Sequence, residues 1–436
     1  MRLAPTIFAA VLAFSLPSMA PAQRPDPYLA RAKAVLRSTP LIDGHNDLPW
    51  RIREDTLRPS DIEGYNLRTH TPGMTDLDRL THGMVGGQFW SVYIPGEPDA
   101  PTYARNGAVS STPGYARAQL EQIQLARRLI AKYPDRLAFV TTERGVRQAF
   151  AQKKIGSLLG MEGGHAIENS LEVLRAYYDL GVRYMTLTHN VTLDWADAAM
   201  DSARHGGLTP FGREVVHEMN RLGMLCDLSH VSPGVMSNVL DATASPVIFS
   251  HSGARALVDH KRNVPDSILR RLPANGGVVM VPFVTVFVSK AVFDDDVAST
   301  RAIEDAKRQY PRDSLAQRRA VVAWRREHPQ PKASLSDVAD QIEHVRKVAG
   351  VDHVGIGSDF DGIIEKVVGL EDVSTFPPLF AELARRGWSD TDLRKLAGEN
   401  VLRVLKRNEV VAAKLQRERP ASIATIQQLD RAKALP

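Results

Sequence analysis

Residues 41–47 read LIDGHND, a short apolar run that ends in histidine and aspartate. Short continuous apolar runs are typical of parallel strands that are buried on both faces. Five more runs end in a residue that can bind a metal or move a proton: 155–161 before Glu162, 184–188 before His189, 224–229 before His230, 247–250 before His251 and 354–358 before Asp359. In a closed barrel of parallel strands, the C-terminal strand ends meet on one rim. We therefore expect these side chains to converge there.

Helical segments alternate with the strand-like runs. Residues 210–222 follow Thr209, a good N-cap, and stop at Gly223. Two further strand-like runs cover residues 87–93 and 276–288. This alternation predicts an α/β protein with a single (β/α)8 barrel of the TIM type.

Three polar segments are expected outside the barrel core. Residues 51–78 and 95–114 are rich in polar and turn-forming residues, which predicts loops over the active rim. Residues 294–332 are highly charged, helical in composition and without a continuous apolar stripe. We expect this segment to form an exposed helical insertion in the barrel.

Composition limits the class of protein. A chain of 436 residues with 43% hydrophobic and 24% charged residues has room for a large soluble barrel. Its net charge of +5 is mild, and no dense Lys/Arg stripe is interleaved with aromatic residues. A nucleic-acid partner is therefore not expected.

The N-terminus predicts export. Arg2 precedes an apolar stretch at residues 6–16, and Ala20-Pro21-Ala22 fits a cleavage site, so residues 1–22 read as a signal peptide. The stretch is too short to span a bilayer, although a retained anchor is the alternative. We expect a periplasmic or secreted protein whose mature chain starts at Gln23.

The C-terminus and the single cysteine fit the prediction of an exported protein. The chain has one cysteine, Cys226, so an internal disulfide is excluded, and we expect a small buried hydrophobe at this position. Residues 416–436 form a polar tail without the hydrophobic stretch of a lipid-anchor signal. The predicted catalytic domain is residues 23–415, with no membrane anchor in the mature form.

His45 and Asp47 form an H-x-D motif. In extended backbone, residues two apart point the same way, so both side chains can reach one cation. Glu162 lies between Gly160 and Gly163, and these small neighbours let its carboxylate approach metal ions closely. Two carboxylate oxygens can bridge two cations. Either motif alone would more often be incidental.

His230 and His251 each end a run and each follow a serine. Neutral imidazole is a good zinc ligand. With His45, Asp47 and Glu162, they predict a site for two Zn²⁺ ions about 3.5–4 Å apart, which would turn water into hydroxide and polarise a carbonyl. The same ligand types also admit manganese or cobalt.

Three further side chains are candidates for catalysis or substrate binding. Asp359 could pass a proton from water to a leaving amine, but Asp361 points the same way and spacing does not separate the two. His189 could stabilise negative charge on the scissile carbonyl oxygen, with a structural histidine as the alternative. Arg262 suits capture of a substrate carboxylate, with a solvated basic loop as the alternative.

Together these segments resemble the membrane (renal) dipeptidases, a family of amidohydrolase-type barrels. The resemblance rests on IDGHNDLPW (42–50), residues 87–93 and 160–164, TLTHN (186–190), DLSHVS (227–232), FSHSGA (249–254), KRNVPD (261–266) and GIGSDFDG (355–362). It implies zinc ligands at His45, Asp47, His230 and His251, a bridging carboxylate at Glu162, substrate contact and oxyanion stabilisation by His189, carboxylate binding by Arg262 and proton transfer by Asp359.

The implied function is a zinc-dependent dipeptidase in which a metal-bound hydroxide attacks the peptide carbonyl. Members of this family tolerate a D-residue at the second position, which makes L,D-dipeptides candidate substrates. Members often form dimers. The animal enzymes carry disulfides and a lipid anchor, which this chain lacks. The alternatives are another binuclear-metal amide hydrolase, such as an N-acyl amino acid deacylase, or a binding protein that keeps its metals without turnover.

Overall fold

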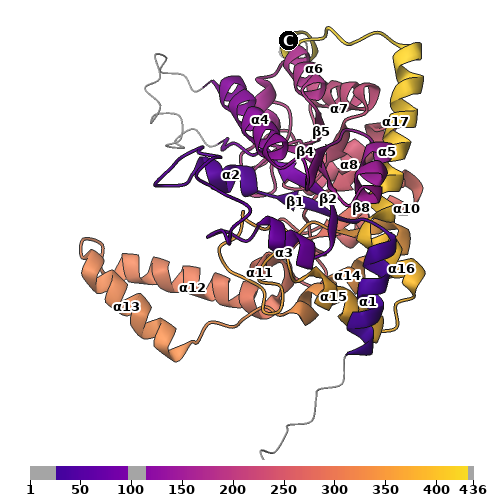
Figure 1. The fold of residues 1–436 in the computed structure, drawn as a ribbon. Helices are drawn as coiled ribbons and strands as arrows, with labels where there is room; N and C mark the ends of the chain where they lie inside the picture. The colour runs from indigo at the N-terminus through magenta and orange to yellow at the C-terminus, as the bar shows by residue number, and fades with distance from the viewer. Residues whose placement is uncertain (1–25, 97–113, 431–436) are drawn as a thin grey trace, which may run out of the picture.

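A computed structural model describes residues 26–96 and 114–430, so the predicted signal peptide lies outside the described residues. Eight parallel strands close into a barrel, and helices surround it (Figure 1). The barrel strands are β1 (Leu41–Asn46), β2 (Val85–Ser91), β4 (Ile155–Glu162), β5 (Val182–Thr186), β6 (Leu225–Asp227), β7 (Ile248–Phe249), β8 (Val278–Val281) and β9 (Val354–Ile356). The pairing of β9 with β1 and of β2 with β4 closes the ring. The predicted (β/α)8 barrel is confirmed.

A ninth strand, β3 (Leu137–Phe139), pairs with the first half of β4. The longer helices around the barrel are α1 (Pro27–Ser38), α4 (Tyr115–Lys132), α5 (Glu143–Ala151), α6 (Leu171–Asp179), α7 (Pro210–Leu222), α8 (Pro233–Ala242), α14 (Leu335–Ala349), α15 (Phe376–Arg385) and α17 (Asn400–Glu418). The shorter ones are α2 (Leu48–Arg53), α3 (Leu77–His82), α9 (Asp266–Leu269), α10 (Leu272–Asn275), α11 (Thr285–Val288), α16 (Asp390–Arg394) and α18 (Ile426–Asp430). None of the helices in the described ranges is long and apolar enough to cross a bilayer.

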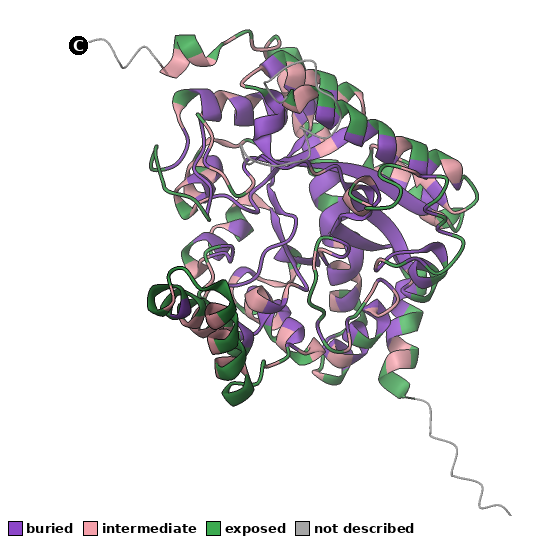
Figure 2. Cartoon of the chain, turned by 90° about the vertical axis from the view of Figure 1, so that its left-hand side faces the viewer, coloured by how far each residue is buried: buried purple, intermediate pink, exposed green. Residues whose placement is uncertain are grey.

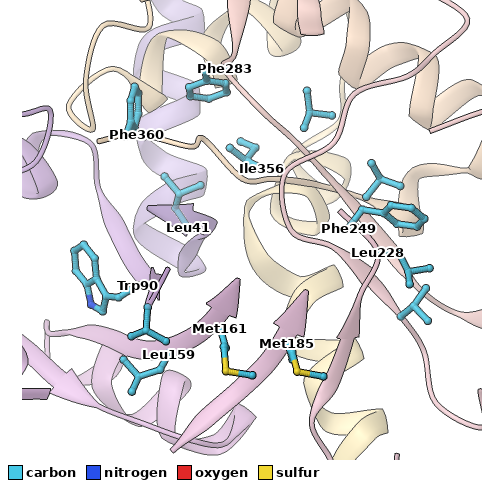
Figure 3. Packing of buried hydrophobic residues seen from close by; sticks show 14 of the residues in the cluster. Leu41, Trp90, Leu159, Met161, Met185, Leu228, Phe249, Phe283, Ile356 and Phe360 are labelled. Carbon is cyan, nitrogen blue, oxygen red and sulfur yellow. The ribbon is translucent and has the colours of Figure 1, made fainter. Parts of the chain in front are cut away.

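Strand burial follows from the apolar runs. Every residue of β1 and of β4 is buried, and the barrel strands are mostly buried whereas the helices expose their outer faces (Figure 2). Side chains alternate between two apolar clusters, because successive residues of a strand point to opposite faces. Ile42, for example, belongs to the interior cluster. Leu41, Trp90 and Leu159 belong to the larger cluster between strands and helices (Figure 3).

Helix α7 begins and ends as its sequence predicts. The Thr209 side chain accepts a hydrogen bond from the backbone N–H of Gly212, and Gly223 ends the helix at φ 86°. Glycine is favoured there because it adopts the left-handed conformation without a Cβ clash. This turn leads directly into β6, and therefore sets where His230 emerges.

The predicted strand at residues 276–288 is too long. Strand β8 ends at Val281, and residues 285–288 form helix α11. Pro282 separates the two, because proline has no N–H to extend the hydrogen-bond ladder. The chain therefore turns onto the rim immediately after β8.

Two helices follow α11 and form a hairpin that projects from the barrel (Figure 1). They are α12 (Lys290–Gln309) and α13 (Ser314–Glu327), within and just before the segment predicted to be helical. None of the residues of α13, all of which the structure describes, is buried, and α12 buries Val292 and Ala306. At the other end of the chain, α17 continues to Glu418, past residue 415. The predicted domain limits stay a prediction.

Candidate metal centre

The five predicted metal ligands converge at the C-terminal end of the barrel. His45 Nε2 lies 3.2 Å from Asp47 Oδ2 and 3.3 Å from Glu162 Oε2. The other Glu162 oxygen, Oε1, lies 2.8 Å from His230 Nε2 and 3.4 Å from His251 Nε2. Glu162 therefore directs its two oxygens at two different sets of imidazoles.

This arrangement fits metal ions better than it fits a hydrogen-bond network. His45 Nε2 and Asp47 Oδ1 are buried and have no hydrogen-bond partner among the described residues. The Nε2 atoms of His230 and His251 face each other at 3.0 Å. Buried polar atoms without partners are costly, and bound cations would satisfy them. The residues present therefore fit a metal cofactor.

Three groups of side chains each bring their possible ligand atoms within 4.8 Å of one another. The groups are His45, Glu162 and His251; Glu162, His189 and His230; and His45, Asp47 and Asp359. The first group joins ligands predicted for both ions through Glu162. The other two add His189 and Asp359, which we predicted as catalytic residues. Both therefore lie close to the ligands and face the same centre.

Each ligand-type imidazole is oriented by a bond to its other nitrogen. His45 Nδ1 lies 2.7 Å from the Tyr184 hydroxyl, and His251 Nδ1 lies 2.8 Å from Ser250 Oγ. His230 Nδ1 lies 3.2 Å from Asn190 Oδ1. Such contacts fix the ring so that its Nε2 would be free to bind a metal ion. Tyr184, Asn190 and Ser250 are not predicted from the sequence, although the serine before His251 is a visible signal.

Two buried aspartates brace the strand ends that precede site residues. The Asp227 carboxylate accepts hydrogen bonds from Ser250 N at 2.8 Å and Ser250 Oγ at 2.6 Å. The Asp43 carboxylate accepts from Ser358 N at 2.7 Å and Ser358 Oγ at 2.7 Å. Burial raises the pKa of Asp43 to about 6. In both cases the braced serine directly precedes a site residue, His251 or Asp359.

Burial sets the charge of the histidine and aspartate side chains in this centre. It lowers the pKa of His230 well below its usual value, and Arg262 lowers it further. It also lowers the pKa of His251 well below its usual value. Both rings are thus neutral, which is the form that binds metals. Burial, together with the charges of Asp47 and Glu162, raises the pKa of Asp359 well above its usual value.

The backbone turns sharply at two of these residues. His230 and Asp359 both have φ 67°, in the left-handed region. Few residues other than glycine adopt it, and strain of this kind gathers at functional sites. In both cases the turn lies three residues after the last strand residue, Asp227 or Ile356, so the side chain leaves the strand direction at the rim.

The structure separates Asp359 from Asp361. Asp359 lines the central cavity, with Oδ1 4.0 Å from His45 Nε2. Asp361 instead accepts a hydrogen bond from the backbone N–H of Met74 at 2.7 Å and holds the rim loop there. Residues two apart point the same way only in extended backbone. Asp359 and Asp361 have φ 67° and 65°, so the backbone is not extended here and the two side chains point to different places.

Arg262 is a buried cation, not part of a solvated basic loop. Only 3% of the residue is exposed, it lines the cavity, and burial lowers its pKa to about 10. Its Nη1 has no hydrogen-bond partner among the described residues. Its guanidinium carbon lies 5.4 Å from the centre of the Phe287 ring. A free donor in this position is suited to an anionic group of a ligand.

The cavity above the ligands has a volume of about 940 Å³. His189 lines it beside Tyr93 and His230, with ring centres 4.8 and 4.4 Å away. The candidates that line its wall are Asp47, Glu162, His230, His251, His189, Arg262 and Asp359. His45 lies beneath them and is fully buried. Asp361, the alternative to Asp359, does not line this cavity.

Cys226 takes no part in this site. It is buried in β6, and burial raises the pKa of its thiol to about 12. A thiol with so high a pKa is a poor nucleophile and ligand. The prediction of a small buried hydrophobe is confirmed.

Comparison with known proteins agrees with this geometry. The sequence profile of the membrane dipeptidase family (peptidase family M19) matches residues 29–419. The probable dipeptidase PvdM from Pseudomonas aeruginosa is 25% identical, with a TM-score of 0.74 over 89% of this chain and 100% of that chain. A metallo peptidase from Rhodobacter sphaeroides, solved with a phosphinate mimic of the dipeptide L-Ala-D-Ala, is 26% identical, with a TM-score of 0.67 over 85% of this chain and 99% of that chain.

A third similar structure is a metallo peptidase described as dipeptidase AC, of family M19. It is 25% identical, with a TM-score of 0.66 over 85% of this chain and 98% of that chain. The profile match covers nearly the whole described chain and includes every residue of the metal centre. The chain therefore belongs to the membrane dipeptidase family, and it is a metallo-dipeptidase.

Proposed function

We propose that the enzyme binds two zinc ions and hydrolyses dipeptides, including those with a D-residue at the second position. His45 and Asp47 would hold one ion, His230 and His251 the other, and Glu162 both. The observation that carries the proposal is the Glu162 carboxylate, with Oε2 3.3 Å from His45 and Oε1 2.8 Å from His230. When bound, the ions would polarise the scissile carbonyl and lower the pKa of a bound water molecule towards neutral pH.

Arg262 would select for dipeptides. Its unpaired, buried guanidinium can bind the C-terminal carboxylate of a substrate through charge-assisted hydrogen bonds. Arg262 lines the same cavity as Glu162 and His230, and we infer that a carboxylate bound to it belongs to the residue next to the scissile bond. A longer peptide would place an uncharged amide against the guanidinium and lose that interaction.

Asp359 and His189 would handle the proton and the developing charge. Burial raises the pKa of Asp359 well above its usual value, so this carboxyl can hold a proton that it takes from water and passes to the leaving amine. His189 lines the cavity next to His230 and would stabilise negative charge on the carbonyl oxygen. The Rhodobacter sphaeroides enzyme, solved with a mimic of L-Ala-D-Ala, supports the proposed L,D-substrates.

The test is hydrolysis by the purified chain from Gln23. The panel contains L,L- and L,D-dipeptides and the matching N-acetyl amino acids, before and after chelation and after adding back zinc, manganese or cobalt. We expect dipeptide hydrolysis that disappears with chelator and returns best with zinc, at two ions per chain by elemental analysis. Faster hydrolysis of the N-acetyl compounds would favour a deacylase. A stoichiometry of one ion would contradict the bridging role of Glu162.

We also infer that the enzyme is exported. The signal-type N-terminus, residues 1–22, and the lack of any cysteine other than Cys226 support this. Expression of the full chain in a bacterium, followed by fractionation and N-terminal sequencing, should give a periplasmic or secreted product that starts at Gln23. A cytoplasmic product that retains Met1 would contradict the inference.

A further inference from the structure

The hairpin of α12 and α13 forms the outer wall of the catalytic cavity. Val292, Asp295, Asp296 and Ser299 of α12 and Arg325 of α13 line the same cavity as the metal ligands. Its volume of about 940 Å³ is near the upper end of the roughly 300–1,000 Å³ that is typical of ligand pockets. The cavity therefore has more room than the backbone of a dipeptide requires.

Two carboxylates on this wall keep an uncompensated charge. Asp296 has no hydrogen bond or ion pair in the part of the chain that the structure describes. Glu365 accepts hydrogen bonds from Gln330 Nε2 at 2.7 Å and from Thr285 Oγ1 at 3.3 Å, and both donors are neutral. Asp295, in contrast, is neutralised by Arg325, whose Nη1 lies 2.8 and 2.9 Å from its two oxygens.

The wall lies next to the residues expected to hold the leaving half of the substrate. The Arg262 guanidinium lies over Phe287 of α11, which leads directly into α12. Glu365 belongs to the segment that follows Asp359. Arg262 would bind the substrate carboxylate, and Asp359 would protonate the new amine. This carboxylate and this amine both belong to the C-terminal residue of the dipeptide. Arg262 lines this side of the cavity, and its buried Nη1 has no hydrogen-bond partner among the described residues, which indicates that a ligand group binds here.

The same wall is amphipathic. Val284, Val286 and Val292 line it together with Asp296 and Glu365. Apolar side chains beside two carboxylates match a side chain with several methylene groups and a cationic end. A short or purely apolar side chain would leave the two charges without a partner.

We propose that this wall is a subsite for the C-terminal side chain of the substrate, and that Asp296 and Glu365 select a basic one such as lysine, arginine or ornithine. The inference rests on the proposed dipeptidase function and names its preferred substrates. Asp296 and Glu365 are both exposed, and ion pairs between exposed side chains contribute about 0.2–1 kcal/mol each. Two of them correspond to a preference of roughly 2- to 30-fold at low ionic strength.

The test compares kcat/KM of the zinc-loaded enzyme for Ala-Lys and Ala-norleucine, with the second residue in its L- and D-form. Norleucine keeps the methylene chain and lacks the amine. We expect Ala-Lys to be preferred several-fold, mainly through a lower KM, and the preference to fall as salt screens the charges. The ratio of the two substrates should approach one in the double variant Asp296→Asn/Glu365→Gln.

Asp294→Asn is the matched control. Asp294 lies on the same helix two residues away, pairs with Lys290 at 2.5 Å, and does not line the cavity. The control should keep the wild-type ratio. An equal rate for both substrates in the wild type, or a preference that survives in the double variant, would overturn the subsite and leave the dipeptidase proposal standing. A preference for Lys-Ala over Ala-Lys would overturn its placement at the C-terminal residue, and no hydrolysis of any dipeptide would overturn both proposals.

Discussion

The rim of the barrel and the α12–α13 hairpin face the same cavity, but they are built in different ways. At the rim, His45, His230 and His251 are buried, and each has its Nδ1 fixed by a neighbouring side chain. In the hairpin, α13 has no buried residue and is tied to α12 by the Asp295–Arg325 pair. Rigid parts of a protein hold reacting groups accurately, whereas exposed parts can change without loss of the core. We therefore propose that the rim carries out the chemistry and that the hairpin selects the substrate.

The change expected to have the largest effect is Glu162→Gln. It keeps the shape of the side chain but removes the charge that lies between His45 and His230. Mutation of a residue that only orients a metal ligand lowers activity by up to about 100-fold. Because Glu162 is itself a proposed ligand, we expect a larger fall in kcat/KM and a loss of bound metal in elemental analysis. The control is Glu327→Gln at the exposed end of α13, which should retain full activity. A fully active Glu162→Gln enzyme would refute the shared-ligand site.

Metal removal tests whether the rim depends on its cofactor for stability. A metal at 1,000 times its dissociation constant stabilises the folded state by about 4 kcal/mol. We expect chelation to lower the melting temperature, and hydrogen exchange to increase around β1, β6 and β7 while α12 and α13 are unaffected. Equal exchange in both regions would show that the division between them is not real.

Tyr184→Phe removes one orienting bond without touching a ligand. The Tyr184 hydroxyl lies 2.7 Å from His45 Nδ1, and loss of such a contact costs about 10- to 100-fold in metal affinity or activity. Chelator competition measures the affinity. Tyr133→Phe is the matched control, since Tyr133 is equally buried but its hydroxyl accepts from Leu67 N at 2.9 Å, outside the metal centre. Equal losses in both variants would mean that the effect is one of general stability.

The smallest effect is expected from Arg325→Ala. The Asp295–Arg325 pair is partly exposed, with 14% and 31% of the two side chains accessible. We expect at most about 1 kcal/mol of lost stability, and a hairpin more sensitive to protease than the barrel. Thermal unfolding and limited proteolysis measure the two. A large drop in melting temperature would show that the hairpin is part of the core.

The barrel and its rim could be predicted because their signals are local. A run of apolar residues marks a doubly buried strand, and the residue that follows it must lie at the rim. His45, Glu162, His230 and His251 all follow from this rule. The end of β8 at Val281 does not follow from this rule, because apolar, β-branched residues continue on both sides of Pro282, and only the proline itself marks the stop.

Contacts across the barrel could not be predicted. Tyr184 reaches His45 from a strand that is not its neighbour, 139 residues away, and no periodicity encodes that meeting. Likewise, composition predicted helices in residues 294–332, but not that the first turns of α12 would face the active site. The direction in which a hairpin folds back depends on tertiary packing, which a single sequence does not display.

The left-handed backbone at His230 and Asp359 has an evolutionary consequence. Such conformations cost about 1 kcal/mol or more for residues other than glycine. Replacement of either residue by glycine would remove this cost and raise stability, so only selection for catalysis keeps histidine and aspartate at these positions. If a lineage of this family no longer needed hydrolysis, glycine at these two positions would be favoured early. Glycine at either position in a relative is therefore a sensitive marker of an active site that no longer catalyses hydrolysis.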